Sequence, residues 1–312
     1  MKVGVVVLNW NGKEDTLSCL ESLAISDYPS ACLLVVDNGS VDGSVDELVE
    51  WSMARGWPVH VQRMAERHQS EWGGRVPFGG RGLFVLRLEE NLGYTGGNNA
   101  GIEWFMHAGA DAVMLLNNDT KVPPNIMGRM VSTLTRREDA GIVGCRIVSA
   151  DSRRVLYQGG NLDYWLGVHF LRRFKGSQSG IVEVNFVPGC AMLVRTPVLR
   201  QVGGLREDLF LYTEDIEFCH RVRRSGWKIV ADLDAVVWAK IGGSSGGPRT
   251  PLYYYYVTRN TLIFIVEELG GIQRLVALAM FVLARMGQVA LWAATRQWDR
   301  IHGVVGLRNP GP

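Results

Sequence analysis

Continuous apolar runs alternate with amphipathic segments through the first half of the chain. An aliphatic run without polar interruption predicts a strand buried on both faces of a parallel sheet. Such runs occupy residues 3–8, 33–37, 83–88 and 112–117, with shorter ones at 59–62 and 141–145. Segments with helical spacing or helix-start residues lie between them, at 14–23, 42–55, 96–109 and 123–136. The alternation predicts an open, mostly parallel α/β sheet.

The same pattern divides the chain into three parts. Residues 1–148 carry the α/β alternation, interrupted at 65–82 by a polar, glycine-rich stretch that we interpret as an inserted flexible loop. Residues 149–260 contain shorter, mixed runs, which predict a more irregular region leaning on the sheet. Residues 261–312 form a tail that is apolar up to about residue 298 but carries scattered arginines.

The stretch 261–298 of this tail predicts amphipathic helices. Its uncharged run between Arg274 and Arg285 is far shorter than the ~20 residues that a membrane-spanning helix needs. A helix lying on a membrane or on a partner fits the pattern, with Trp292 and Trp298 as interfacial anchors. A helix packed on its own domain fits it equally well.

Composition narrows the class of protein. The chain has 312 residues, of which 21% are charged and 47% hydrophobic, which is an ordinary globular balance. A formal net charge of +2 gives no reason to expect a nucleic acid partner. The five cysteines are dispersed and indicate buried thiols in a reducing compartment. The first apolar run is too short for a signal peptide, so we expect a cytoplasmic protein.

Polar clusters follow the predicted strands where each one ends. They read "NWNG" (9–12), "DNGS" (37–40), "ENLGYTGGNN" (90–99) and "NNDT" (117–120). Each alone is a weak signal, because Asn, Asp and Gly are common turn residues. Together they converge on one sheet edge, where open α/β sheets bind ligands. The first cluster lacks Gly-x-Gly-x-x-Gly, which argues against a dinucleotide oxidoreductase.

Several of these residues suit a nucleotide diphosphate. Asp37 can hydrogen-bond a base or ribose, and Asp119 can give one hard oxygen ligand to Mg²⁺ or Mn²⁺. Gly97 permits close backbone approach, and Asn98 offers an amide donor near a helix N-terminus.

A second acidic signal lies in "LFLYTEDIEF" (209–218), where Thr213 is a candidate helix cap. Glu214 and Asp215 then lie in the first turn, where acidic residues are common in any helix because of its dipole. The functional alternative is a general base that accepts the proton of a hydroxyl nucleophile.

The ordered motifs "VVVLNWNG", "VVDNGSVDGS", "ENLGYTGGNNAGI", "LLNNDT", "VPGCAMLVR", "GGLREDLFLYTEDIEFCHRVRRSGW" and "YYYYVTRN" resemble family 2 inverting glycosyltransferases. The resemblance covers residues 2 to about 262 and is strongest to the bacterial rhamnosyltransferase-like branch. It implies a GT-A fold, in which a nucleotide-binding α/β sheet is fused to a mixed acceptor-binding region. It also implies transfer of a sugar from a nucleotide diphosphate donor to a hydroxyl group, with inversion.

The resemblance also assigns roles to residues. Asp215 would be the catalytic base, and Asp119 would hold the metal on the diphosphate. We expect Glu214, Gly189 and Trp227 to contact the acceptor. The nucleotide site would be lined by Asn9, Asn11, Asp37, Asn38, Asn91, Gly97, Asn98 and Asn118.

One position departs from the family pattern. Family members commonly have a histidine that helps to bind the metal or diphosphate where this chain has Ala239. A methyl group can do neither, so three alternatives stay open: weaker metal binding, substitution by Lys240, or an altered and inactive protein.

The family resemblance favours an enzyme over two alternatives. One is a nucleotide-sugar-binding protein with little catalysis, suggested by Ala239. The other is a nucleotidyltransferase, disfavoured because "NWNGKED" offers only Lys13 to a triphosphate. For the enzyme we expect a deoxythymidine or uridine diphosphate donor, with rhamnose as the first choice of sugar. The expected acceptor is a surface or cell-wall glycan, free or lipid-linked, and the tail would allow peripheral contact with the inner face of the cell membrane.

Overall fold

The computed structural model describes residues 1–64, 78–165, 171–173, 179–240 and 250–305. Its centre is an 11-stranded sheet with the order β11-β13-β7-β12-β5-β1-β2-β4-β3, to which β6 and β8 add by pairing with β13 and β7. The strands are β1 (Val3–Asn9), β2 (Ala31–Asp37), β3 (Val59–Met64), β4 (Leu83–Leu88), β5 (Ala112–Asn117), β6 (Thr120–Lys121), β7 (Ala140–Ser149), β8 (Val155–Tyr157), β11 (Ile181–Val184), β12 (Ala191–Arg195) and β13 (Lys228–Ala239). Strands β9 (Gly160–Leu162) and β10 (Leu171–Arg173) form a separate pair.

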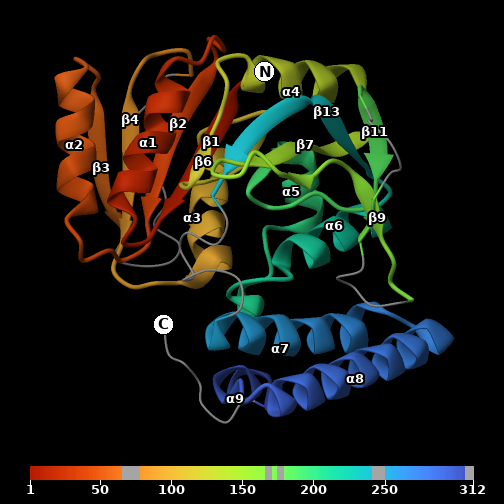
Figure 1. Cartoon of the computed structure of the whole chain (residues 1–312). Helices are drawn as coiled ribbons and strands as arrows, with labels where there is room; N and C mark the ends of the chain where they lie inside the picture. Colours follow the sequence, from red (N-terminus) through yellow and green to blue (C-terminus); the bar gives the residue numbers. More distant parts are fainter. Residues whose placement is uncertain (65–77, 166–170, 174–178, 241–249, 306–312) are drawn as a thin grey trace.

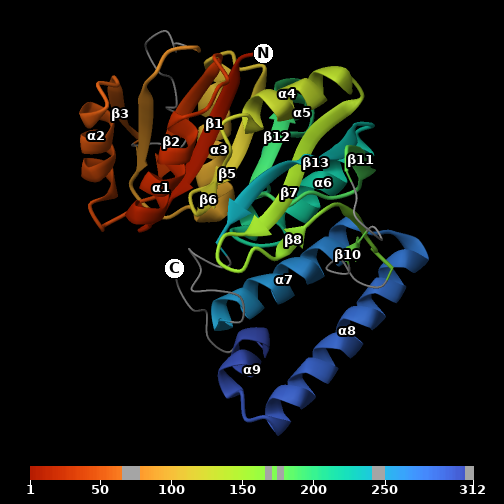
Figure 2. The same cartoon turned by 45° about the horizontal axis from the view of Figure 1, so that its top comes forward.

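Helices cover both faces of the sheet. They are α1 (Lys13–Ala24), α2 (Ser44–Ala54), α3 (Gly93–His107), α4 (Ile126–Arg136), α5 (Thr196–Val202), α6 (Glu214–Arg224), α7 (Pro251–Glu268), α8 (Gly271–Ala294) and α9 (Trp298–Val305), with a 3-10 turn η1 (Glu207–Leu209). Helices α1 and α4 lie on one face, whereas α3, α5 and α6 lie on the other (Figures 1 and 2). The mixed α/β fold with a large, mostly parallel sheet is the predicted one.

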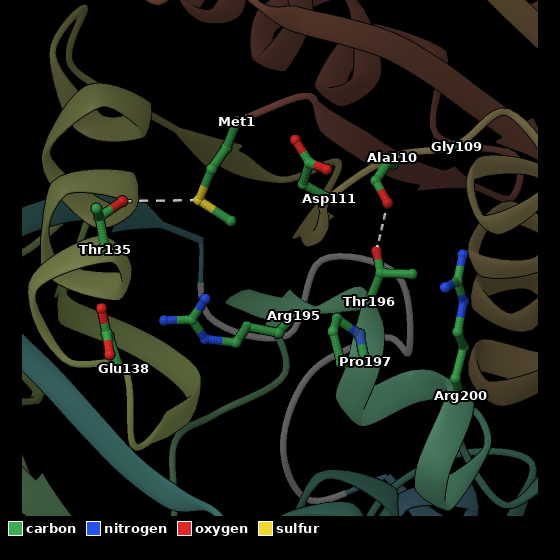
Figure 3. Close-up of a pocket in the computed structure, with 10 residues that line it drawn as sticks. All are labelled: Met1, Gly109, Ala110, Asp111, Thr135, Glu138, Arg195, Thr196, Pro197 and Arg200. Carbon is green, nitrogen blue, oxygen red and sulfur yellow. Dashed lines mark hydrogen bonds between the residues drawn. The ribbon is translucent and has the colours of Figure 1, made fainter.

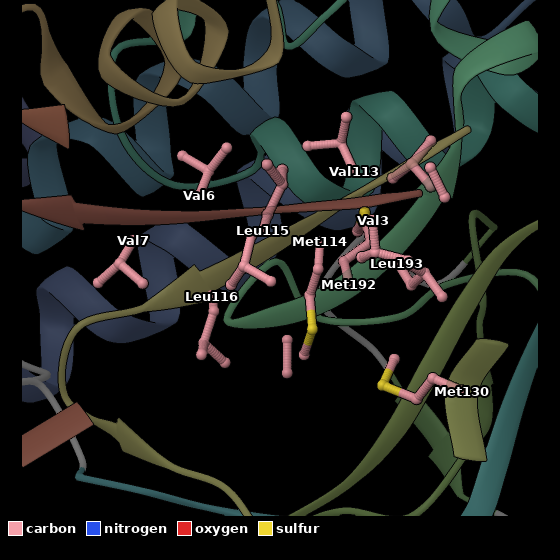
Figure 4. Packing of buried hydrophobic residues seen from close by; sticks show 14 of the residues in the cluster. Val3, Val6, Val7, Val113, Met114, Leu115, Leu116, Met130, Met192 and Leu193 are labelled. Atoms are coloured by element: carbon pink, nitrogen blue, oxygen red, sulfur yellow. The ribbon is translucent and has the colours of Figure 1, made fainter. Parts of the chain in front are cut away.

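The parallel half of the sheet follows directly from the apolar runs. Strand β1 pairs in parallel with both β2 and β5, so its side chains are covered by helices on both faces and must be apolar. Figure 4 shows the β1 valines packed with the apolar side chains of β5 and β12. The register places Asn9 opposite Asp37 and Leu8 opposite Asn117, so the polar strand ends meet at one edge.

The second half of the sheet belongs to the same layer. Strand β12 is antiparallel to β5 and β7, and β13 is parallel to β7. The sheet is thus continuous across the predicted division at 148/149. That residues 1–148 bind the nucleotide sugar and residues 149–260 the acceptor stays a prediction. Helix α4 begins at Ile126 and not at 123, and β7 continues to Ser149. Of the loop predicted at 65–82, residues 65–77 lie outside the described residues.

The C-terminal helices form a layer beside the sheet (Figures 1 and 2). Helix α7 contacts α6, α8 and α9, and it begins before residue 261, where the tail was predicted to start. Its Phe264 and Ile265 form a small core with Ile216 of α6 and Ala277 of α8. Of the described residues, one helix, α8, is long and apolar enough to cross a membrane, by length and composition only. The sequence prediction, that the run between Arg274 and Arg285 is too short for a membrane-spanning helix, was therefore too strict, because α8 extends beyond both arginines.

Candidate active site

Asn9 organises the first polar group at the carboxyl edge of the sheet. Its side-chain nitrogen donates to Asp37 Oδ1 at 2.9 Å and to Ser40 Oγ at 3.1 Å, and its oxygen accepts from Thr16 Oγ1 at 2.8 Å. The Oδ2 atom of Asp37 is buried and has no hydrogen-bond partner among the described residues. A buried carboxylate oxygen without a donor costs free energy. This oxygen is therefore suited to accept a hydrogen bond from a ligand N–H or hydroxyl.

Other predicted nucleotide residues hold the loops around this group. Asn11 accepts from the Val41 N–H at 2.8 Å and has a positive φ of 48°. Asn38 donates to Asn91 Oδ1 at 2.8 Å and accepts from the Leu92 N–H at 3.0 Å. The two Asn38 bonds attach the end of β2 to the start of α3. Direct contact of Asn11, Asn38 or Asn91 with a nucleotide stays a prediction.

Gly97 and Asn98 also have internal roles. A Cβ atom at Gly97 would lie 2.4 Å from Leu8 Cδ1, so the glycine allows α3 to pack closely on β1. The Asn98 amide donates to the Tyr94 carbonyl of its own helix at 2.8 Å. The structure thus requires a glycine here for close packing of helix and strand, and close approach of a ligand at Gly97 stays a prediction.

Asp119 lies between β5 and β6, beside the position where a histidine was expected. Thr120 pairs with Ala239 across β6 and β13, and the Lys240 N–H donates to the Asp119 carbonyl at 3.1 Å. The neighbouring Asn118 donates to Thr16 Oγ1 at 3.0 Å, which connects this turn to α1.

The side chains around Asp119 have the chemistry of a sparse metal site. The Asp119 side chain is 9% exposed and borders a cavity of about 300 Å³, together with Asp15, Asp151 and Lys240. Among the residues that the structure describes, no group of three or more His, Cys, Asp or Glu side chains could hold a metal ion. One carboxylate nevertheless fits the way Mg²⁺ binds to nucleotides, with substrate phosphates and water as the remaining ligands.

Lys240 is engaged elsewhere. Its ammonium group forms an ion pair with Asp15, and the hydrogen bond to that carboxylate raises the pKa of Lys240. The alternative in which Lys240 replaces the histidine therefore requires this ion pair to be shared or broken.

Asp215 is the centre of a second group. Its Oδ2 accepts from the Gly189 N–H at 3.1 Å and its Oδ1 from the Ile216 N–H at 2.8 Å. Burial raises the pKa of Asp215 to about 6, although these backbone hydrogen bonds lower it. Burial, and next the charge of Asp215, raise the pKa of the adjacent Glu214 well above its ordinary value. The pair therefore combines a carboxylate that is ionised at neutral pH with a neighbour that tends to stay protonated.

Tyr94 joins the two groups and was missed in the sequence. Its hydroxyl donates to the Gly189 carbonyl at 2.9 Å, and burial raises its pKa well above the ordinary value. The carbonyl of Cys190, the residue after Gly189, accepts from the Asn117 N–H at 3.0 Å. The turn at Gly189 and Cys190 thus lies between Asp215 and the end of β5 that leads to Asp119. The signal in the sequence was a single aromatic residue inside "GYTGG".

The structure does not bring Trp227 to this group. It follows the C-terminal end of α6, whereas Asp215 lies at the opposite end of that helix. Its indole donates to Gln201 Oε1 at 2.8 Å, and its side chain packs over Gly141 near the start of β7. We therefore withdraw Trp227 from the acceptor contacts.

Thr213 does not cap α6 with its side chain. It has a positive φ of 71°, and its buried hydroxyl has no hydrogen-bond partner in the described part of the chain. The preceding loop, and not a capping side chain, positions the start of α6.

A larger cavity lies at the opposite edge of the sheet. This cavity of about 560 Å³ is lined by Met1, Asp111, Arg195 and Arg200 among others. Figure 3 shows these lining side chains. Arg195 donates to the carbonyls of Leu134, Arg137 and Ala140, and so fixes the end of α4 and the start of β7. Its hydrogen bonds serve the fold, and the cavity is remote from the carboxyl edge where the polar clusters converge.

Comparison with known proteins agrees with this arrangement. A family model described as "Glycosyltransferase like family 2" matches residues 2–245. The chain belongs to this family. The predicted glycosyltransferase family and GT-A fold are confirmed.

Two relatives show the range of the family. The N-acetylglucosaminyl-diphospho-decaprenol L-rhamnosyltransferase of Mycobacterium tuberculosis is 26% identical over 270 residues, which are 81% of this chain and 80% of the relative. The low-salt glycan biosynthesis hexosyltransferase Agl10 of Haloferax volcanii is 25% identical over 232 residues, 73% of this chain. The match spans only 63% of the length of Agl10.

Solved structures of this glycosyltransferase fold are similar throughout the chain. Staphylococcus aureus TarS 1–349 matches with a TM-score of 0.60 and 18% identity, over 97% of this chain and 81% of that one. The mannosyltransferase PcManGT of Pyrobaculum calidifontis, in complex with GDP-Man and Mn²⁺, matches with a TM-score of 0.58 and 14% identity, over 97% and 85%. At these identities the likeness concerns the fold alone.

Proposed function

We propose that this family 2 protein is an inverting hexosyltransferase with Asp215 as its catalytic base. The observation that carries the proposal is the Asp215 carboxylate, which is half-buried and oriented by two backbone N–H groups. Its pKa, raised to about 6, keeps it ionised at neutral pH. General bases work best when their pKa lies near the working pH. Its link through Gly189 and Tyr94 to the start of α3 connects the base to the predicted nucleotide group.

The reaction is a single displacement. Asp215 accepts the proton of an acceptor hydroxyl while that oxygen forms a bond to the anomeric carbon of the donor. The bond from this carbon to the diphosphate breaks on the opposite face, and its electron pair leaves with the nucleotide diphosphate. Attack opposite the leaving group inverts the anomeric configuration. Glu214, whose pKa is raised beside the base, can donate a hydrogen bond to the acceptor when it is protonated.

The nucleotide would bind along the edge formed by Asn9, Asp37 and the loop at Asn91. We assign Asp37 Oδ2 to a base or ribose donor, because it is the buried oxygen there that still needs one. Asp119 would hold Mg²⁺ or Mn²⁺, which supplies positive charge to the departing diphosphate. Ala239 beside it adds no ligand, so we expect metal binding weaker than with a histidine there.

For the substrates we propose a deoxythymidine diphosphate sugar, with rhamnose first and a uridine diphosphate sugar second. The acceptor we propose is a lipid-linked glycan. The name of the mycobacterial relative, an N-acetylglucosaminyl-diphospho-decaprenol L-rhamnosyltransferase, supports rhamnose as the sugar and a lipid-linked acceptor. The TarS complex with UDP-GlcNAc supports the uridine alternative.

A thermal-shift screen of nucleoside diphosphates, with and without Mn²⁺, tests the donor site. A ligand that binds only the folded state stabilises it, by about 2.7 kcal/mol at 100 times its Kd. We expect the preferred base to raise the melting temperature by several degrees, and the Ala239→His variant to show a larger additional shift with Mn²⁺. If no nucleoside diphosphate stabilises either protein, the proposed donor site is wrong.

Ala239 also motivates a second candidate function, a nucleotide-sugar-binding protein with little catalysis. Calorimetric titration beside a donor-hydrolysis assay separates the two. Tight binding without turnover of any donor would favour the second candidate, whereas steady release of nucleotide diphosphate would exclude it.

We further propose that α8 lies on a membrane. Its exposed side chains from Leu275 to Ala294 are all uncharged, whereas Arg274 and Arg285 are half-buried. Arg274 donates to the Leu269 carbonyl and Arg285 to Gln288. The polar side of this helix therefore faces the protein and the apolar side faces outward. Such a face matches the acyl chains of a bilayer better than water.

The ends of the helix fit the same orientation. Arg296 and Trp298, which is 55% exposed, follow α8 directly and suit the headgroup region. Trp292 is not an anchor, contrary to the prediction, because it is buried against Tyr254 with ring centroids 4.6 Å apart. A peripheral position would place the active site beside a lipid-linked acceptor.

Replacing Leu283 with glutamate should release the protein from vesicles of phosphatidylethanolamine and phosphatidylglycerol. Leu283 is 63% exposed, and removing one buried leucine from lipid loses roughly 1.5–3 kcal/mol, or about 10- to 100-fold in affinity. Flotation assays measure the bound fraction. Met53→Glu on α2 is the control, since Met53 is 67% exposed but remote from α8. Equal flotation of both variants would contradict a lipid-facing α8.

A further inference from the structure

The loop that leads into α6 has an unusual backbone. Phe210, Tyr212 and Thr213 have φ angles of 63°, 65° and 71°, in the left-handed region that non-glycine residues rarely adopt. Residues in such conformations persist only where the surrounding structure holds them, and they concentrate at functional sites. Asp215 follows this loop by two residues. The contacts that hold the loop therefore bear on the position of the base.

Asn260 of α7 is the main contact on one side of the loop. It is fully buried, and its side-chain nitrogen donates to the carbonyls of Leu209, Leu211 and Tyr212 at 2.8, 2.9 and 2.8 Å. The two N–H hydrogens of one amide are thus shared among three carbonyls that the turning backbone directs toward α7.

Arg259 fixes the orientation of that amide. Its guanidinium donates to Asn260 Oδ1 at 2.7 Å and to the Asp208 carbonyl at 2.9 Å. Because the amide oxygen is occupied by a donor, the amide nitrogen faces the loop. The dipeptide "RN" near the end of "YYYYVTRN" therefore acts as a unit, for which the sequence suggested no role.

The N-terminus of α3 holds the other side of the loop. The Thr95 N–H donates to the Phe210 carbonyl at 3.2 Å, and a Cβ atom at Gly93 would lie 2.4 Å from the Phe210 ring. The Phe210 ring in turn stacks on Tyr256 of α7, with centroids 5.3 Å apart. The loop is thus clamped between α7 and the helix that carries Tyr94.

We infer that Asn260 is a positioning residue for the catalytic base. By fixing the carbonyls of the loop, it fixes where α6 begins and hence where the Asp215 carboxylate meets the Gly189 N–H. It touches no substrate, and its effect passes through the backbone of residues 209–213. The catalytic part of this inference rests on the proposed function, whereas the clamp itself does not.

The variant Asn260→Asp tests the clamp with almost no change in size. It replaces the donor with an oxygen that repels the three carbonyls. We expect backbone amides in 209–217 to exchange hydrogen at least about 10-fold faster, measured by mass spectrometry. We also expect kcat to fall by about 10- to 100-fold, because small displacements of a catalytic group have effects of this size. The Kd for nucleoside diphosphate should change less than about twofold.

Phe264→Leu is the matched control in the same helix. Phe264 is buried one turn further along α7, in the small core with Ile216, and does not bind the loop. It should lower the melting temperature without the selective loss of kcat or the faster exchange in the loop 209–213. Arg259→Gln, at a half-exposed side chain, should show the effects of Asn260→Asp in weaker form and keeps the test available if Asn260→Asp does not fold.

The outcomes separate the two proposals. Unchanged exchange at 209–217 in a folded Asn260→Asp or Arg259→Gln would overturn the clamp. Faster exchange with unchanged kcat, or an equal loss of kcat in Phe264→Leu, would overturn the positioning role. Faster exchange in a protein that transfers no sugar even as wild type would support the clamp and contradict the proposed function.

Discussion

Asp215→Asn is expected to lower sugar transfer by about 10²- to 10⁴-fold, the range that a general base contributes. The amide cannot accept the acceptor proton, but it keeps the shape of the side chain. Affinity for the nucleotide diphosphate should stay within about twofold of wild type. The measurement is release of nucleotide diphosphate from the donor, with and without a lipid-linked acceptor. Wild-type activity should rise with pH and level off above about 6, where Asp215 is ionised.

Asp208→Asn is the control for this substitution. Asp208 lies in η1, shortly before the same loop, but its side chain is half exposed and paired with Arg206. It should retain transfer. Wild-type rates in Asp215→Asn would show that another group is the base.

Asp215→Asn should also make the protein more stable at neutral pH. Burial raises the pKa of Asp215 from 3.8 to about 6, so between these values the folded protein binds more protons than the unfolded chain. The free energy of unfolding therefore falls as the pH rises from about 4 to 6, by at most roughly 3 kcal/mol. The neutral amide of the variant carries no such cost. We expect a higher melting temperature than wild type at pH 8 and no gain at pH 4. Equal differences at both pH values would contradict a half-buried Asp215 carboxylate with a raised pKa.

Asp119→Asn is expected to have the second-largest effect, a loss of about 10²- to 10³-fold in kcat. The substitution removes the carboxylate that would hold the metal against the diphosphate. Affinity for nucleoside diphosphate should lose its dependence on Mn²⁺, which titration calorimetry measures directly. The affinity without metal should change little.

Asp151→Asn provides the matched control for Asp119. Asp151 borders the same cavity but is exposed, so its loss changes the local charge without removing the predicted ligand. If both variants lose the same activity, the effect comes from the charge of the cavity and not from a metal ligand. An Mn²⁺ dependence that survives in Asp119→Asn would disprove the assignment.

The parallel half of the sheet was predictable because its strands are covered on both faces. Buried parallel strands must be continuously apolar, so their positions are visible in the sequence, and β1 and β5 lie within one residue of the predicted runs. Their polar ends were also visible as clusters. The place of β12 between β5 and β7 was not, because strand pairing depends on partners distant in the chain.

The sequence did not show the contacts that several site residues make. Trp227, Gly97 and Asn98 were assigned from residue type, which does not show what a side chain touches. In the structure, Trp227 follows the far end of α6, Gly97 accommodates Leu8, and Asn98 bonds its own helix. The left-handed loop before Glu214 has no glycine to reveal it, and its clamp comes from some fifty residues later in the chain.

Helix α7 contacts both the loop before α6 and helix α8, and this affects how a shortened form of the protein should be designed. Asn260 of α7 binds the loop that leads into α6, residues 209–213, and the same helix contacts the apolar α8. A truncation placed at the end of the family match, near residue 245, would improve solubility by removing α8, but it would also remove the clamp. Such a shortened protein could bind nucleotide and still transfer no sugar. A cut after Gly270 would keep the clamp and is the safer design.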